Sequence, residues 1–273
     1  MTDNPPESTV ATTATSSVED PGGQMTFFEH LVELRKRIIH SLIAIGAGAL
    51  VGWYVAPHFV SWITKPMLKA LGGAHLDQKL VYTNPTGYLS LLITLSVYLG
   101  IVLASPVVLY QFWLFVAPAL YKHERSAITG FLFSTVFLFL SGIAFGYFIM
   151  LPSVLKFLIS FQGPVVPLIS INEYFDLTLM VLLGVGLVFE LPILIFFLSL
   201  FGVVTPKFLW KNSKYAILVI TVVAAFITPT PDALTMLIFM APMVVLYFAG
   251  IGVSALVVGR RNKRLAAAAT GTT

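Results

Sequence analysis

Long apolar runs separated by short polar stretches dominate this chain. Six segments have the composition of membrane-spanning helices, and they cover residues 38–57, 87–110, 126–151, 175–201, 215–227 and 233–258. A helix rises about 1.5 Å per residue, so a span needs about 20 residues to cross the hydrocarbon core. The run at 215–227 has only 13 residues and falls short of that length. We predict an all-α integral membrane protein with six transmembrane helices.

Several short signals mark where these helices begin and end. Thr26 and Glu29 have capping-box spacing, and Ser170 and Glu173 repeat it before the fourth span. Residues 61–86 are predicted to form a loop on the far side of the membrane, and 111–125 a polar loop on the near side. Apolar residues at helical spacing within 152–169 predict a short helix lying on the far surface, between spans three and four.

The two ends of the chain differ in composition from the middle. Residues 1–24 are rich in Thr, Ser, Pro and acidic residues, and we predict a disordered cytoplasmic tail without the apolar core of a secretory signal. Residues 25–259 form the predicted transmembrane domain. Residues 260–273 are basic at first and then small, and they are predicted to form a second cytoplasmic tail.

Basic residues are distributed unevenly between the two sides of the predicted spans. Twelve of the 16 fall on one side: Arg35, Lys36, Arg37, Lys122, Arg125, Lys207, Lys211, Lys214, Arg260, Arg261, Lys263 and Arg264. The other four are Lys65, Lys69, Lys79 and Lys156. Because loops rich in Lys and Arg stay in the cytoplasm, both termini are predicted to be cytoplasmic.

Composition excludes several classes of function. Apolar residues make up 58% of the 273 positions and charged residues 10%, against about 25% in soluble domains. The net charge of +4 is too small to indicate nucleic-acid binding, and the chain has no cysteine for a disulfide or thiolate site. The five histidines are dispersed without metal-ligand spacing. We expect no metal, no cofactor and no catalytic residue.

Two carboxylates near the cytoplasmic interface allow two interpretations. In the first, Glu33 pairs with Arg37 four residues later, a contribution of about 0.3 kcal/mol, and Glu124 offsets neighbouring basic residues. In the second, the two carboxylates form a receptor for a cationic ligand from the cytoplasm. Guanidinium groups suit such a receptor because they bind carboxylates through two parallel hydrogen bonds.

Two other acidic residues lie in or beside spans. Glu190 is near the middle of the fourth span, where a carboxylate is costly and function is the default hypothesis. The alternative is a protonated side chain bonded to a neighbouring helix. Asp232 follows Pro231 at a helix start, where it either caps the helix or has a separate role. The Gly48–Gly52 and Gly142–Gly146 pairs predict close helix packing.

With these residues in view, the chain resembles the TatC family, the large subunit of the twin-arginine protein translocase. The resemblance covers about residues 26–258 in matching order. It rests on the stretches HLVELRKR (30–37), SPVVLYQFW (105–113), FVAPALYKHER (115–125), FELP (189–192) and TPD (230–232).

The resemblance implies a receptor, not an enzyme, in the bacterial cytoplasmic (inner) membrane. It implies binding of the paired arginines of signal peptides on folded cargo. It also implies assembly with TatA- and TatB-type single-span subunits and, as a homo-oligomer, with further copies of the chain. The positions that match family functional residues are Glu33, Glu124, Phe115 and Arg35 for the signal peptide, Glu190 for the intramembrane partner, and Pro66 and Asp232 for the far-side loops.

A different class remains open: a small-solute or proton-coupled transporter with Glu190 as the coupling group. Against it stand the single intramembrane charge and the lack of paired broken helices in the sequence. A membrane-embedded hydrolase has no arrangement of nucleophile and base to support it. Membrane lipid is the other expected contact, and nucleic acid is not expected.

Overall fold

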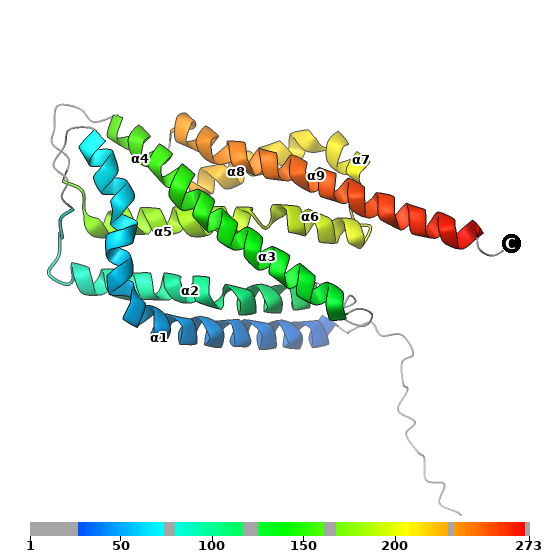
Figure 1. Ribbon diagram of the computed structural model, residues 1–273, viewed down its shortest axis with the longest axis horizontal. Coiled ribbons are helices and arrows are strands. Elements are labelled where there is room, and N and C mark those ends of the chain that lie inside the picture. The colour runs from blue at the N-terminus through cyan, green and yellow to red at the C-terminus, as the bar shows by residue number, and fades with distance from the viewer. Residues whose placement is uncertain (1–26, 74–79, 117–124, 161–167, 229–231, 271–273) are drawn as a thin grey trace, which may run out of the picture.

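The computed structural model describes residues 27–73, 80–116, 125–160, 168–228 and 232–270 (Figure 1). Its helices are α1 (Phe27–Gly73), α2 (Gly87–Val116), α3 (Arg125–Phe145), η2 (Gly146–Met150), α4 (Leu151–Ser160), α5 (Ile171–Val188), α6 (Leu191–Leu200), α7 (Pro206–Lys211), α8 (Ser213–Ile227) and α9 (Ala233–Thr270). Within the described ranges the only strand-type pairing is an isolated bridge between Val81 and Ser170. The predicted all-α class is confirmed.

Five stretches of helix are long and apolar enough to cross a membrane: His30–Gly73, Gly87–Val116, Phe131–Ser160, Ile171–Leu200 and Ala233–Gly259. The remaining apolar helix, α8, has only 15 residues, as the short apolar run predicted. At about 1.5 Å per residue it is shorter than the hydrocarbon core. The chain therefore has five helices of spanning length and one short apolar helix in the part that the structure describes.

The first helix differs from its prediction because it does not end near Pro57. It continues to Gly73 with Pro57 and Pro66 inside it, and Figure 1 shows its second half turning across one end of the molecule. The predicted loop at 61–86 is therefore wrong for residues 61–73. Ile63, Met67 and Leu71 are buried at four-residue intervals, which is the spacing of one helix face.

Two tyrosines from other helices stabilise this second half of α1. Pro66 has no N–H, so the carbonyl of Trp62, four residues earlier, loses its helical donor. The hydroxyl of Tyr147 donates to that carbonyl at 2.7 Å, and the hydroxyl of Tyr174 donates to the next carbonyl, Ile63 O, at 2.5 Å. The proline is thus accommodated without an unpaired acceptor.

The predicted separate surface helix between spans three and four is also not what the chain forms. Residues 151–160 continue α3 directly through the π-helical turn η2. Val154 and Leu155 are almost completely buried, and Ile159 belongs to the same core as α1 and α5. These apolar residues face protein, so this segment is the end of a long packed helix.

Helix ends follow the predicted signals only in part. Helix α5 begins at Ile171 as expected, but Ser170 makes no capping hydrogen bond. Thr205 does cap α7, because its side chain accepts from Phe208 N. Helix α9 continues to Thr270, so the helix extends into the predicted C-terminal tail. Thr26, residues 1–24 and Glu124 lie outside the described residues.

Close packing at glycines holds neighbouring helices together, as the glycine pairs predicted. A Cβ atom built on Gly48 would lie 2.6 Å from Gly100 O, and one on Gly52 would lie 2.6 Å from Ser96 O. The same holds between α3 and α5, where a Cβ on Gly142 would lie 2.9 Å from Gly186 Cα. The backbones of α1 and α2 therefore touch directly.

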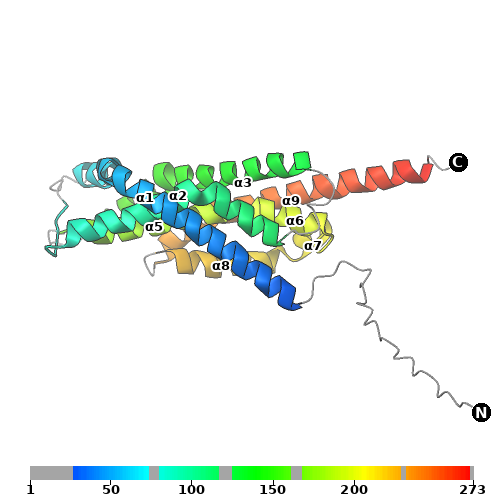
Figure 2. The ribbon, with the colours of Figure 1, turned by 90° about the horizontal axis from the view of Figure 1, so that it is seen from below.

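The start of α1 and the end of α9 lie at the same end of the molecule (Figures 1 and 2). The end of α2 and helix α7 are found there too. The second half of α1 and helix α4 lie at the opposite end. The two ends therefore carry different parts of the sequence.

Candidate functional site

Glu33 lies two turns into α1, at the end of the molecule where that helix begins. Its Oε1 accepts a hydrogen bond from Arg37 Nη2 at 2.8 Å, and the two side chains are 17% and 23% exposed. The predicted pairing of these residues is therefore confirmed. Because both are mostly removed from solvent, the contact is screened less than a surface ion pair.

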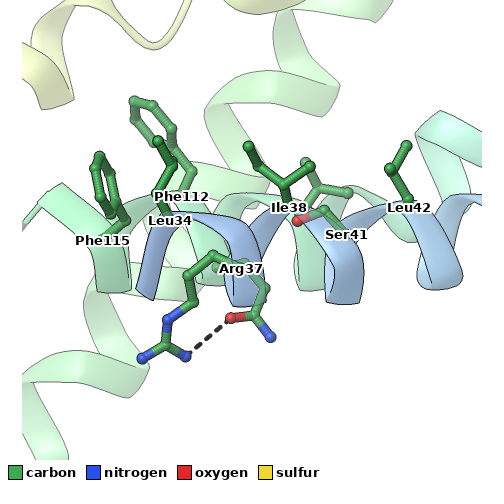
Figure 3. Close-up of a pocket in the computed structure, with 9 residues that line it drawn as sticks. Leu34, Arg37, Ile38, Ser41, Leu42, Phe112 and Phe115 are labelled. Atoms are coloured by element: carbon green, nitrogen blue, oxygen red, sulfur yellow. Dashed lines mark hydrogen bonds between the residues drawn. The ribbon is translucent and has the colours of Figure 1, made fainter. Parts of the chain in front are cut away.

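Arg37 also connects α1 to α2. Its Nη1 donates to Gln111 Oε1 at 3.0 Å, and Figure 3 draws this bond as a dashed line. Gln111–Val116 are helical, so the predicted near-side loop begins later than residue 111. Glu33 Oε2 and Arg37 Nε are buried without a hydrogen-bond partner among the described residues. The pair is thus held in place but keeps one free acceptor and one free donor.

A cavity of about 220 Å³ lies next to this pair, between α1 and α2 (Figure 3). Its lining is mostly apolar and consists of Leu34, Arg37, Ile38, Ser41, Leu42, Val108, Gln111, Phe112 and Phe115. The Phe115 ring stacks on His30 with the ring centroids 4.4 Å apart. The site therefore combines a carboxylate and an arginine with an adjoining apolar groove.

The predicted signal-binding residues are brought together only in part. Glu33 and Phe115 come close, because Phe115 stacks on His30, which precedes Glu33 by one helical turn. Arg35 is exposed and is not among the residues that line the groove. Glu124 falls outside the described residues. Gln111 was not predicted as the partner of Arg37, since the two residues are 74 positions apart.

A second polar cluster lies inside the bundle at Glu190. Helices α5 and α6 are interrupted at Phe189 and Glu190, as expected where Pro192 follows within the first turn. Trp113 Nε1 donates to Thr135 Oγ1 at 3.0 Å, and Thr135 Oγ1 donates to Glu190 Oε2 at 2.5 Å. This chain of hydrogen bonds joins α2, α3 and the α5–α6 junction.

The direction of these bonds follows from the groups involved. An indole N–H can only donate, so Thr135 accepts from Trp113 and gives its own proton to Glu190. Thr135 is fully buried, and a lone threonine in an apolar run gives no sequence signal of such a role. Glu190 Oε1 is buried without a partner among the described residues. The predicted bond from Glu190 to a neighbouring helix is confirmed, and one acceptor remains.

The two residues predicted for far-side loops have structural roles. Asp232 Oδ1 accepts from Thr235 N at 2.7 Å, so the predicted cap at the start of α9 is confirmed. Pro66 lies inside α1 and not in a loop. It borders a second cavity, which also contains three lysines.

The fold and these sites define a class: a multi-pass helical membrane protein with a carboxylate–arginine pair at one end and a bonded carboxylate within the bundle. Residues 29–242 match the family described as Sec-independent protein translocase protein (TatC). The chain belongs to the TatC family. Members of this family are named as components of a protein translocase, which is a transport role.

Individual members of the family are similar to this chain in sequence along most of their length. The chain is 49% identical over 242 residues to the TatC protein of Koribacter versatilis (strain Ellin345), covering 88% of this chain and 89% of that one. It is 37% identical to TatCy of Bacillus subtilis (strain 168), covering 89% and 94%. A crystal structure described as the twin-arginine translocase receptor TatC superposes with a TM-score of 0.73 at 36% identity, covering 84% of this chain and 99% of that chain.

Proposed function

We propose that this protein is the receptor subunit of a twin-arginine translocase, which binds the paired arginines of signal peptides on folded cargo. It does so at the cytoplasmic face and assembles with TatA- and TatB-type single-span subunits and with further copies of itself. The solved relative that is described as a receptor supports this proposal. The observation that carries it is the buried oxygen of Glu33, unpartnered among the described residues; the ion-pair partner of Glu33, Arg37, lines an apolar groove.

Glu33 suits an incoming guanidinium for a geometric reason. One of its oxygens already accepts from Arg37, and the other is buried without a partner among the described residues. A buried acceptor without a donor is costly, so a ligand that donates to it is favoured. Arg37 occupies the carboxylate as an internal guanidinium, and the ligand binds beside it or displaces it. Glu124 supplies the second carboxylate in this proposal.

The groove beside Glu33 suits the apolar part of a signal peptide. A signal peptide carries an apolar segment after its charged region. Phe112 and Phe115 line the groove from α2, and Leu34, Ile38 and Leu42 line it from α1. Charged and apolar parts of one peptide would therefore meet complementary surfaces. In this proposal Arg35, exposed on α1, borders the bound peptide.

We infer the membrane topology from the same arrangement. Helices α1 and α9 have their outer ends at one end of the molecule, and basic residues near those ends favour the cytoplasm. With α8 as a short sixth span in the bacterial inner membrane, both termini are cytoplasmic. A helix of 15 residues is accommodated by local thinning of the bilayer. Asp232 then lies on the far side.

The test is binding of a signal peptide with an arginine pair, and of its Lys-Lys variant, to the purified protein in nanodiscs. We expect the arginine peptide to bind about tenfold more tightly, because lysine supplies the charge without the planar fork. Fluorescence anisotropy of labelled peptide measures both affinities. Equal affinities would contradict recognition of the guanidinium pair, and no binding of either peptide would contradict the receptor function.

Glu190 is proposed to dock a helix of a small partner subunit. Its Oε1 is free among the described residues, and Leu187, three residues before it, is 63% exposed. Replacing Glu190 with leucine is expected to weaken recruitment of the partner roughly three- to twentyfold, the range for one hydrogen bond between membrane helices. Thr135 then bonds a carbonyl of its own helix, so folding is retained.

Co-purification of a tagged TatA- or TatB-type subunit measures this recruitment. Leu187→Ala is the matched control, because it trims the neighbouring apolar surface without removing the acceptor, and it is expected to have a smaller effect. Normal recruitment by the Glu190→Leu protein would exclude docking at this carboxylate.

A further inference from the structure

A cavity of about 510 Å³ lies at the end of the molecule opposite Glu33. The second half of α1 lines it on one side, and the consecutive helices η2 and α4 line it on the other. Its volume is in the range of small-molecule binding sites. The residues that carry the argument below are Lys65, Lys69, Tyr147, Phe148, Pro152 and Lys156. None of them belongs to the two polar clusters already described.

The lysines give this cavity a strong positive charge. Lys65 and Lys69 are four residues apart on α1, so they lie on one helix face, and Lys156 comes from α4. All three are exposed, and no ion pair joins them to a carboxylate within the part of the chain that the structure describes. Like charges at this spacing destabilise a helix. An anion bound between them would remove that repulsion.

The distribution of charge along the sequence makes this gathering unusual. Only four of the 16 basic residues lie on this side of the predicted spans, and three of those four line one cavity. Basic residues scattered over a surface would not converge in this way. The helix at residues 61–73 brings Lys65 and Lys69 to the same cavity as Lys156 of α4, whereas the loop predicted there placed no lysine beside α4.

The rest of the lining is mostly apolar. Phe148 is 67% exposed, and Tyr147 stacks on Trp62 with ring centroids 3.9 Å apart. Tyr and Trp side chains favour the interface between headgroups and acyl chains. A ligand that fits both parts of the cavity has a negatively charged head and an apolar tail.

We propose that this cavity binds the phosphate of an anionic phospholipid, with the acyl chains lying along Phe148. The lysine ammonium groups donate to the phosphate oxygens, as in other basic pockets between membrane helices. The lipid then fills the space between α1 and α4 and holds the bent half of α1 against the bundle. This site is independent of the proposed signal-peptide receptor.

The test uses the absence of cysteine from the chain. Gly73 borders the cavity, and a side chain added there meets no atom within 4 Å. A Gly73→Cys protein labelled with a fluorophore is placed in nanodiscs that contain brominated phosphatidylglycerol or brominated phosphatidylcholine, each over the same series of mole fractions. We expect brominated phosphatidylglycerol to quench the fluorescence at a mole fraction several-fold lower than brominated phosphatidylcholine does. Equal quenching by the two lipids would overturn the proposal.

Lysine variants in the same background locate the interaction. Replacing Lys65, Lys69 and Lys156 together with glutamine is expected to abolish the several-fold preference for phosphatidylglycerol, because the charges that attract the anionic headgroup are removed. The matched control replaces Lys207, Lys211 and Lys214, which are exposed at the other end of the molecule, and it is expected to keep the preference. A preference that survives in the first triple variant would overturn the proposal.

Two further arms separate a lipid from a free anion. Inorganic phosphate at millimolar concentration, compared with chloride at matched ionic strength, is expected to leave the quenching unchanged. Loss of the preference in phosphate alone would assign the site to a soluble anion. Phe148→Ser is expected to weaken the preference because the acyl chain loses its contact, and an unchanged preference would likewise contradict a lipid ligand.

Discussion

Replacing Gly48 with valine is expected to destabilise the protein by about 3 kcal/mol or more. The Cβ atom alone would lie 2.6 Å from Gly100 O and 3.1 Å from Gly100 Cα. These are backbone atoms of α2, which cannot rotate away as a side chain can. Helices α1 and α2 would have to move apart, and the contact between Arg37 and Gln111 would lengthen with them. Unfolding in mixed micelles, followed by circular dichroism, measures the loss.

The matched control is Gly46→Val, two residues earlier in the same helix. A side chain at Gly46 meets nothing within 4 Å, so its effect on the free energy of unfolding is expected to stay within about 1 kcal/mol. Similar stability of the two variants would contradict direct backbone contact between α1 and α2.

Replacing Glu33 with glutamine is expected to weaken binding of an arginine-pair signal peptide about 10- to 100-fold. Hydrogen bonds to a charged group are worth about 1.5–3 kcal/mol, and 1.4 kcal/mol corresponds to a factor of ten in affinity. The amide still offers Arg37 a neutral acceptor, and Arg37 keeps Gln111, so the site should remain assembled. Peptide binding in nanodiscs measures the change.

Glu173→Gln is the control for this substitution, because it removes the same charge from an exposed position at the start of α5. It is expected to bind the peptide as the unmodified protein does. Glu124→Gln, measured beside it, tests the second proposed carboxylate. If Glu33→Gln bound normally while remaining folded, the Glu33–Arg37 pair would be structural only.

The number of apolar helices follows from the sequence because the membrane imposes a simple length requirement. Backbone groups inside a bilayer must be paired within a helix, so an apolar run of sufficient length predicts one. The five long spans and the short α8 were predictable on this basis. The pair of Glu33 and Arg37 was predictable too, since residues four apart meet on any α-helix.

The ends of the helices were less predictable where tertiary contacts extend them. Pro66 and the nearby charges of Lys65 and Lys69 suggested a loop. Helix α1 continues nevertheless, because Ile63 and Leu71 are buried in the core and the Tyr147 hydroxyl donates to the carbonyl that the proline leaves without a donor. The donor comes from a residue 85 positions away. Local sequence carries no sign of it.

In the two polar clusters, the carboxylates could be identified from the sequence, whereas their partners could not. Sequence alone identified the membrane class, the TatC resemblance, and the acidic residues Glu33 and Glu190 as sites of interest, because a carboxylate in or beside an apolar span is costly wherever it lies. Their partners Gln111, Thr135 and Trp113 come from other helices. Which side chains meet depends on helix packing over long separations, and the approach of helices at glycines such as Gly48 sets that packing.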